Sequence, residues 1–412
     1  MPSIEELRAC IVRLDGEIEL QKKLLRKLEK DKILAHRQLN AALDPVARLP
    51  FEISSEILLR SHAARRVPSA LLQICNAWTE IVLDTPALWT TICIHFPCGD
   101  DFAELLRIWF QRARNRPVSI AISLNGRCGS WNHHISDVVW RHSGLFEHLE
   151  ILDDDDLARD DESLDLFGDI TSVSLPLLQT LTIRCQHEQR IYRASQILQL
   201  LRGAPNIVEF ISHKVWTRDN PSPETLVVPT LRRVIFGETS NGDDEVFLHL
   251  VLPALETLSL PMRYVSSDEF VARIERSAAP LQDLALGWKL GVMGAVQLHN
   301  CLRLIPTLIR FKMWLPHSEV VTELFTALAE SPSLLPNLRD LTIDIYTGDL
   351  PHIPDSSWRT LVRALSTRRM ERLWIIPVPV SPPTDVLASL RELAAAGTKM
   401  HVGTEKLNFV VA

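Results

Sequence analysis

The chain has 412 residues, of which 46% are hydrophobic and 23% charged, and its formal net charge is −7. This length exceeds what one hydrophobic core usually holds, so we expect two or three units or a repeat array. Acidic and basic residues are interspersed and form no basic patch, which argues against a nucleic-acid-binding protein.

Seven cysteines are scattered along the chain, and their odd number and irregular spacing fit neither a disulfide framework nor a metal site. We therefore expect reduced thiols in a cytoplasmic or nuclear protein. The N-terminus is charged from its start. No apolar run reaches the roughly 18 residues that a membrane span needs, so we expect neither a signal peptide nor a membrane segment.

Residues 3–43 are predicted to form one long helix. Read as heptads from Ile4, the a and d positions are mostly Ile and Leu as far as Leu28. Ile at a with Leu at d favours a parallel two-stranded coiled coil, so we expect residues 1–43 to be a coiled-coil helix and the chain to form a homodimer through residues 3–43. A helix folded back on its own chain is the alternative. The predicted seam consists of Ile4, Leu7, Ile11, Leu14, Ile18, Leu25 and Leu28.

Residues 44–94 are predicted to form three short helical segments, which open at Pro50, Pro68 and Pro86. Proline suits the first helical turn because its missing N–H would lack a partner there. The apolar side chains of these segments fall on more than one helical face, and about 50 residues cannot bury them all. Part of this surface therefore needs a partner, in this chain or another.

Three motifs follow one another in this region: Leu-Pro-x-Glu-Ile at 49–53, Cys-x-x-Trp at 75–78 and Pro-x-Leu-Trp at 86–89. Their order resembles the F-box, most closely the F-box-like modules common in fungal proteins, although many members carry a basic residue or serine where Asn76 stands. The resemblance implies docking on a Skp-type adaptor that joins the chain to a cullin–RING ubiquitin ligase. An ordinary helical core segment is the alternative. The implied adaptor contacts are Leu49, Pro50, Ile53, Ile57, Leu58, Trp78, Leu88 and Trp89.

Residues 95–144 are predicted to connect this module to the rest of the chain. Apolar residues recur at helical spacing from Phe102 to Phe110, and Pro117 ends that helix. Large apolar residues then occupy every second position from Val118 to Leu124, which is typical of a half-buried strand. The region therefore contributes one helix and a first strand.

From Leu145 to the end, the pattern apolar-x-x-apolar-x-apolar recurs at intervals from 24 residues (Ile207 to Leu231) to 32 residues (Phe146 to Leu178). This period is that of leucine-rich repeats, with one strand and one helix per unit. We expect an α/β fold in which residues 145–412 form an irregular leucine-rich-repeat solenoid with a parallel sheet. A doubly wound α/β domain is the alternative. Helices are predicted at 193–202, 267–277, 318–329, 356–366 and 384–396.

The predicted target-binding patch lies on the last repeats. Strand side chains alternate between faces, so the residues between the buried leucines face the concave side of the sheet. In the last copies most of these residues are charged or aromatic, and Trp and Arg dominate the energy of many interfaces. The alternative is that both tryptophans are covered and cap the array. The predicted patch consists of Arg310, Lys312, Trp314, Asp340, Asp344, Arg372 and Trp374.

Signatures of catalysis are missing from the sequence, which has no phosphate-binding loop, nucleophile elbow or zinc-protease motif. Cys128 with His133, His134, His142 and His148 fits no zinc spacing, and the acidic run at 153–162 lacks the pattern of a calcium loop. We expect no metal, no cofactor and no enzymatic activity. The F-box resemblance implies a target-recruiting subunit of a Skp–cullin–F-box ubiquitin ligase. A repeat scaffold acting outside any ligase is the alternative.

Overall fold

The computed structural model describes residues 3–61, 68–124, 132–153, 163–168, 170–185, 191–217, 224–237, 244–288, 295–346 and 353–411. The chain divides into two compact units. Unit 1 consists of Met1–Cys93 with Ile108–Arg116, and unit 2 consists of Ile94–Arg107 with Pro117–Ala412. Among the described residues, no helix combines the length and the apolar character required to cross a membrane.

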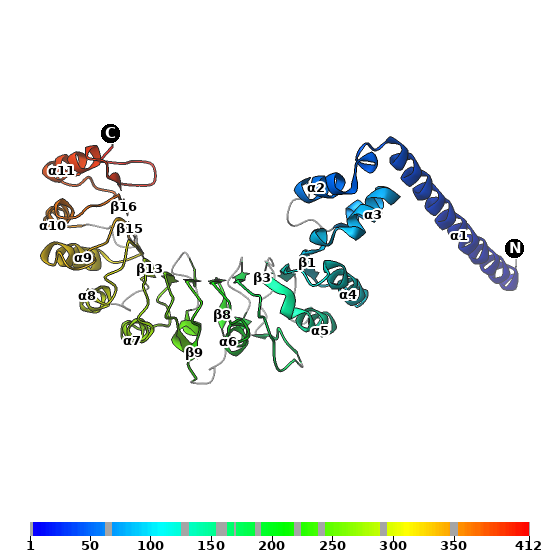
Figure 1. Ribbon diagram of the computed structural model, residues 1–412, viewed down its shortest axis with the longest axis horizontal. Helices are drawn as coiled ribbons and strands as arrows, with labels where there is room; N and C mark the ends of the chain where they lie inside the picture. The colour runs from blue at the N-terminus through cyan, green and yellow to red at the C-terminus, as the bar shows by residue number, and fades with distance from the viewer. Residues whose placement is uncertain are drawn as a thin grey trace. The chain divides into compact units, whose positions relative to one another are not determined.

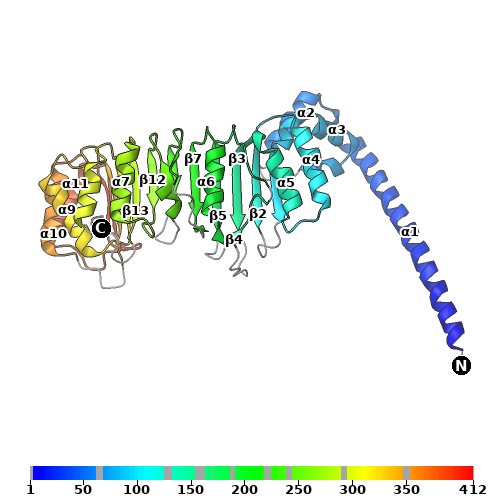
Figure 2. The same ribbon diagram turned by 90° about the horizontal axis from the view of Figure 1, so that it is seen from below.

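Unit 1 begins with the long helix α1 (Ile4–Leu43), which the heptad pattern predicts. Ser3 and Glu6 form a reciprocal capping box, which satisfies two N–H groups at the start of the helix. The helix ends at Leu43, because Asp44 precedes a proline and such a residue is disfavoured in helical conformation. No residue of α1 is buried, and the helix extends away from the other helices of its unit (Figures 1 and 2).

Short helices make up the rest of unit 1, and each of the three prolines lies at the start of one, as predicted. The middle segment is predicted as one helix that opens at Pro68, but the structure divides it into two helices. Cys75 has extended backbone, so a 3₁₀ helix from Pro68 stops before α3 begins at Asn76. The helices are η1 (Val46–Arg48), α2 (Phe51–Ser61), η2 (Pro68–Gln73), α3 (Asn76–Asp84) and η3 (Pro86–Trp89).

Trp89 lies at the centre of the contacts that close unit 1. Its indole nitrogen donates a hydrogen bond of 2.8 Å to the Val82 carbonyl oxygen. The second half of α4 (Asp101–Ala113) brings Trp109 edge-on against Trp89, with ring centroids 5.1 Å apart. The Arg112 guanidinium lies 4.7 Å from the centroid of the Trp89 ring. The predicted connecting helix therefore also contributes to the core of unit 1.

Unit 2 is built on a parallel sheet whose strands follow one another in chain order. Every neighbouring pair from β2 to β17 is parallel. A doubly wound sheet would reverse its strand order, so this alternative is wrong. The strands are β1 (Thr91–Phe96), β2 (Val118–Leu124), β3 (Phe146–Asp153), β5 (Thr180–Cys185), β7 (Glu209–His213), β10 (Arg233–Ile235), β12 (Thr257–Leu260), β13 (Asp283–Gly287), β14 (Arg310–Trp314), β15 (Asp340–Asp344), β16 (Arg372–Ile376) and β17 (Lys399–Val402).

Helices cover the convex face of this sheet (Figure 1). The five helices predicted in the repeat region agree with the structure to within one residue at each end, whereas α8 is an addition. The helices are α5 (His133–Arg141), α6 (Ala194–Gly203), α7 (Ser267–Ser277), α8 (Ala295–Arg303), α9 (Ser318–Glu330), α10 (Asp355–Ser366) and α11 (Thr384–Ala395).

The core of unit 2 lies between sheet and helices, because the apolar positions of the recurring pattern point to the helical side. In the copy that contains β15, Leu338, Leu341 and Ile343 are all buried, while Asp340 and Thr342 on the other face remain partly exposed. The sheet starts earlier than the predicted boundary at residue 145. Its first two strands have the same alternation. The spacing of the repeat pattern also occurs at Trp89, Ile92 and Ile94 of β1, whereas β2 lacks an apolar residue three positions before Val118.

Candidate interaction surfaces

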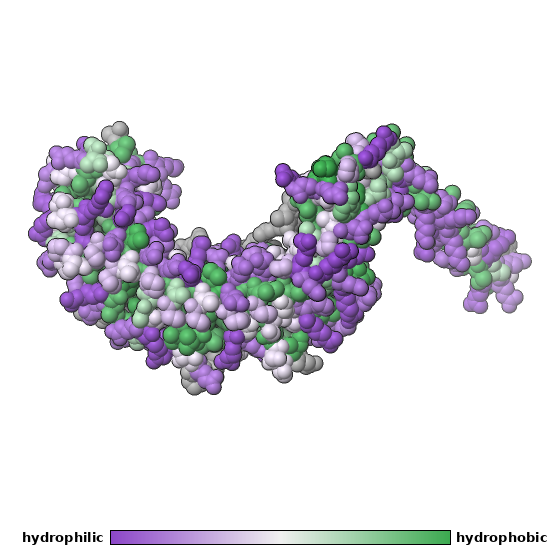
Figure 3. Space-filling view, in the orientation of Figure 1, coloured by the Kyte–Doolittle hydropathy of each residue, from purple (hydrophilic) through white to green (hydrophobic). Residues whose placement is uncertain are grey.

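An exposed apolar surface gathers at the start of α2. Pro50 starts the helix, and Ile53 and Ile57 follow four residues apart on one side, with exposed fractions of 51% and 39%. Ser54 and Leu58 lie one position further round the helix and are buried. Figure 3 shows apolar surface over this part of the chain. We call this surface the α2 apolar face, and it consists of Leu49, Pro50, Phe51, Ile53 and Ile57.

Three of the predicted adaptor contacts do not lie on the surface of unit 1. Leu58, Leu88 and Trp89 are buried in unit 1, because helical periodicity turns Leu58 inwards and α4 covers Trp89. Trp78 is half-buried. Leu49, Pro50, Ile53 and Ile57 are exposed, as a binding role requires. Phe51 joins them, although it occupies the unspecified position of the Leu-Pro-x-Glu-Ile motif.

The predicted coiled-coil seam forms a second exposed apolar surface in unit 1. Its side chains range in exposure from 46% at Leu14 to 71% at Ile4. Apolar residues appear along α1 among charged ones (Figure 3). The alternative, a helix folded back on its own chain, would bury one side of α1, and no such burial is present.

In unit 2, the strand register arranges the exposed side chains of the concave face in rows. Arg310, Asp340, Arg372 and Lys399 occupy equivalent positions on β14 to β17, and we call them the charged row. Two residues further along the same strands come Lys312, Thr342, Trp374 and His401. The register therefore brings together most of the predicted target-binding residues.

Trp314 is the exception, and its assignment to an exposed patch is wrong. It is 4% exposed and lies opposite Asp344, one row beyond Trp374. The alternation of faces ends with the strand, since Met313 and Trp314 are both buried and Leu315 has a positive φ of 54°. The Lys312 ammonium lies 5.3 Å from the Trp314 ring centroid. Trp374 is half-buried and stacks on His401, with centroids 4.2 Å apart.

Asp344 lies at the C-terminal end of β15 and is partly buried. Burial is the main cause that raises the pKa of its carboxyl group above the ordinary aspartate value, and the negative charge of Glu405 acts in the same direction. Lys312 opposes this shift. Asp344 is therefore less favourable as an exposed charge in the predicted patch than Asp340, which faces Arg372 at 3.8 Å.

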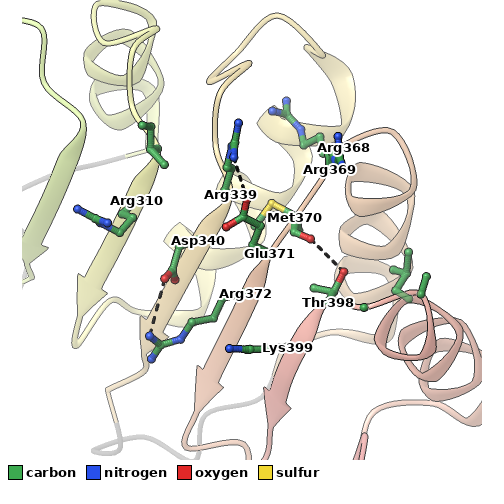
Figure 4. A pocket seen from close by; sticks show the side chains of 14 residues that line it. Arg310, Arg339, Asp340, Arg368, Arg369, Met370, Glu371, Arg372, Thr398 and Lys399 are labelled. Atoms are coloured by element: carbon green, nitrogen blue, oxygen red, sulfur yellow. Dashed lines mark hydrogen bonds and ion pairs between the residues drawn. The ribbon is translucent and has the colours of Figure 1, made fainter.

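A cleft of about 830 Å³ opens at the N-terminal ends of β14 to β17 (Figure 4). We call it the basic cleft, because six of its lining residues carry a positive charge and two a negative charge. Glu371 pairs with Arg339 at 2.8 Å. Arg368, Arg369 and Lys399 lie outside the patch that the sequence predicts, and only the fold shows that they share a cleft with Arg372. Its charged lining residues are Arg310, Arg339, Asp340, Arg368, Arg369, Glu371, Arg372 and Lys399.

Metal-binding and thiol chemistry find little support in the part of the chain that the structure describes. There, no three His, Cys, Asp or Glu side chains come close enough to hold a metal ion. Cys128 and residues 154–162 lie outside the described residues. Burial raises the pKa of the Cys301 thiol to about 12, which keeps this cysteine protonated and unreactive at neutral pH.

Comparisons with known proteins leave the family of this chain open: no protein-family model matches it, and no curated protein sequence does either. The interaction surfaces therefore rest on their geometry alone. Unit 1 offers exposed apolar side chains, and unit 2 offers charged and aromatic side chains in rows.

Proposed function

We propose that this protein is the target-recruiting subunit of a Skp–cullin–F-box type ubiquitin ligase. The observation that carries the proposal is the α2 apolar face, which leaves large apolar side chains exposed where the F-box motif has its adaptor contacts. Burying one such side chain against a partner is worth up to about 1.5–3 kcal/mol, so several together support stable association.

In this proposal, unit 1 binds the adaptor and unit 2 binds the target. Catalysis belongs to the ligase enzymes that the adaptor brings. The contribution of this chain is to raise the effective concentration of the target near those enzymes. The concave face supports the second role, because its rows offer the exposed Arg310 and Arg372 and the half-buried Trp374, residue types that contribute strongly at interfaces.

We further propose that α1 joins two copies of the chain as a parallel coiled coil. The exposed seam supports this assembly, and so do charges beside it. In the heptad register, Glu17 of one copy lies near Lys22 of the other. Opposite charges at such flanking positions favour the parallel pairing.

Co-purification with a Skp-type adaptor tests the ligase proposal. Replacing Ile53 and Ile57 by glutamate places two charges on the α2 apolar face without touching the core. We expect adaptor binding to weaken by more than about 100-fold, because two buried charges without partners are costly. The matched control replaces Val380 and Leu407, exposed apolar residues of unit 2, by glutamate. This control should leave adaptor binding unchanged.

A scaffold acting outside any ligase is the second candidate function. It is favoured by the burial of Leu58, Leu88 and Trp89, three of the residues implied as adaptor contacts. In that case the unaltered full chain fails to bind the adaptor, while the concave face still binds its target. Adaptor binding that persists at full strength in the Ile53→Glu, Ile57→Glu variant would also contradict the proposed contact surface.

A further inference from the structure

The charged row on the concave face continues back along the sheet to β7. Along it, basic side chains pair with acidic side chains of the preceding strand, except on the last strand. Further back in the same row, Arg233 pairs with Glu209 at 3.1 Å, and Arg310 forms two contacts with Asp283. Each of these arginines has an acid on the preceding strand. Arg372 follows the same pattern with Asp340, although the distance is 3.8 Å. Lys399 breaks it, because its neighbour on the preceding strand is Arg372.

Two cations therefore lie side by side at the end of the row. Neighbouring strands are about 4.8 Å apart, and like charges placed opposite each other destabilise a sheet. Figure 4 shows Lys399 pointing toward Arg372 across the basic cleft. Among the described residues, no carboxylate forms an ion pair with Lys399. An anion bound between the two side chains would relieve their repulsion.

The other cations of the basic cleft differ in whether they already form hydrogen bonds or ion pairs. Arg368 is occupied, since its guanidinium donates hydrogen bonds to the carbonyl oxygens of Leu328, Ser331, Leu334 and Leu335 at 2.7–3.0 Å. Arg310 and Arg339 are held in ion pairs. Arg369 is exposed, and no acidic side chain in the described part of the chain pairs with it.

From this distribution of charge we infer that the basic cleft binds an acidic segment of a protein target, with Arg369, Arg372 and Lys399 contacting its side-chain anions. The inference rests on the proposal that unit 2 binds a protein target. The anions are carboxylates or phosphates, because both present the oxygen atoms that arginine and lysine bind.

A peptide fits the cleft better than a nucleic acid does. Asp340 and Glu371 line the same cleft and would repel the closely spaced phosphates of a nucleic acid strand. A peptide carries its anionic side chains with gaps between them, so its charges can meet Lys399 and Arg369 and avoid these two carboxylates. The net charge of −7 of the whole chain also disfavours a polyanion without such spacing.

Fluorescence anisotropy with the purified full chain tests the inference. The probes are three labelled peptides of about twelve residues with identical spacing of their polar positions. One carries Asp and Glu, one carries phosphoserine, and one carries Asn and Gln. We expect both acidic peptides to bind and the amide peptide not to bind. Tighter binding of the phosphoserine peptide would identify phosphate as the preferred anion, and equal binding would show that carboxylates suffice.

The Arg369→Gln, Lys399→Gln variant should weaken binding of the acidic peptides at least about tenfold, as expected for the loss of two charge-assisted contacts. The matched control, Arg276→Gln with Arg303→Gln, removes the same charge from exposed positions on α7 and α8. It should change binding less than about twofold, since it acts only through the screened net charge.

Three results would overturn the inference. They are equal binding of the amide peptide, equal weakening by the control variant, and full displacement by a single-stranded oligonucleotide of the same charge. Adaptor binding is measured separately. A chain that binds the acidic peptide but not the adaptor would refute the ligase proposal and leave the basic cleft as a peptide site.

Discussion

The two units use their apolar residues in opposite ways. Unit 1 leaves Ile and Leu side chains of α1 and α2 exposed, although it is the smaller unit. In unit 2 the apolar positions of the strands are buried under helices, and the concave face displays ion pairs such as Glu209–Arg233. An apolar surface favours stable association that depends little on salt, whereas a charged one favours specific and salt-sensitive contacts. We therefore expect the two units to bind different kinds of partner.

Truncation of a strand leucine offers the largest expected effect. Leu341→Ala in unit 2 removes a fully buried side chain of β15 and should lower the free energy of unfolding by about 2–5 kcal/mol. Ile53→Ala in unit 1 should change it by less than about 0.5 kcal/mol, because that side chain is already exposed. Urea denaturation followed by circular dichroism measures both. Similar losses of unfolding free energy for the two variants would contradict the contrast between the units.

Charges introduced along α1 test the second apolar surface. Ile11→Asp with Ile18→Asp places acids in the predicted seam and should weaken dimerisation by more than about 100-fold. Light scattering during size-exclusion chromatography reports the mass. The control is Val12→Asp with Leu20→Asp, two exposed apolar positions off the seam. A chain that is monomeric without any substitution would contradict the homodimer.

Binding at the two kinds of surface should respond differently to salt concentration. Raising the salt concentration from about 0.05 M to about 0.3 M shortens the Debye length from about 14 Å to about 6 Å. We expect binding of the acidic peptides to the basic cleft to weaken several-fold. Binding of the adaptor to the α2 apolar face should stay within about twofold. The opposite order would exchange the roles proposed for the two surfaces.

Asp344 provides the smallest and most local test. Its folded-state pKa is raised by burial, so the folded state holds this proton more tightly than the unfolded state does. The contribution of Asp344 to stability therefore falls as pH rises from the ordinary aspartate pKa through the raised one. Asp344→Asn should stabilise the protein at pH 7 by less than about 1 kcal/mol, since partial exposure screens the effect. At pH 3 the two chains should unfold alike.

Several features of this fold follow from the sequence alone. The period of the apolar residues predicted α1 and the buried positions of strands such as β15, because a side chain's direction depends only on its place in a helix or strand. The repeat spacing predicted a parallel sheet with a helix between strands. The F-box resemblance named Ile53 and Ile57 as contact residues, and both are exposed on α2.

Tertiary structure decided which of those faces are covered. Trp89 is buried because Trp109, twenty residues later, packs against it. Trp314 is buried where the alternation of faces ends at the C-terminal end of β14. The basic cleft depends on register: Arg372 and Lys399 are 27 residues apart in sequence and become neighbours only when β17 pairs with β16. Periodicity assigns a side chain to a face of its own element, whereas burial and charge pairing depend on what lies against that face.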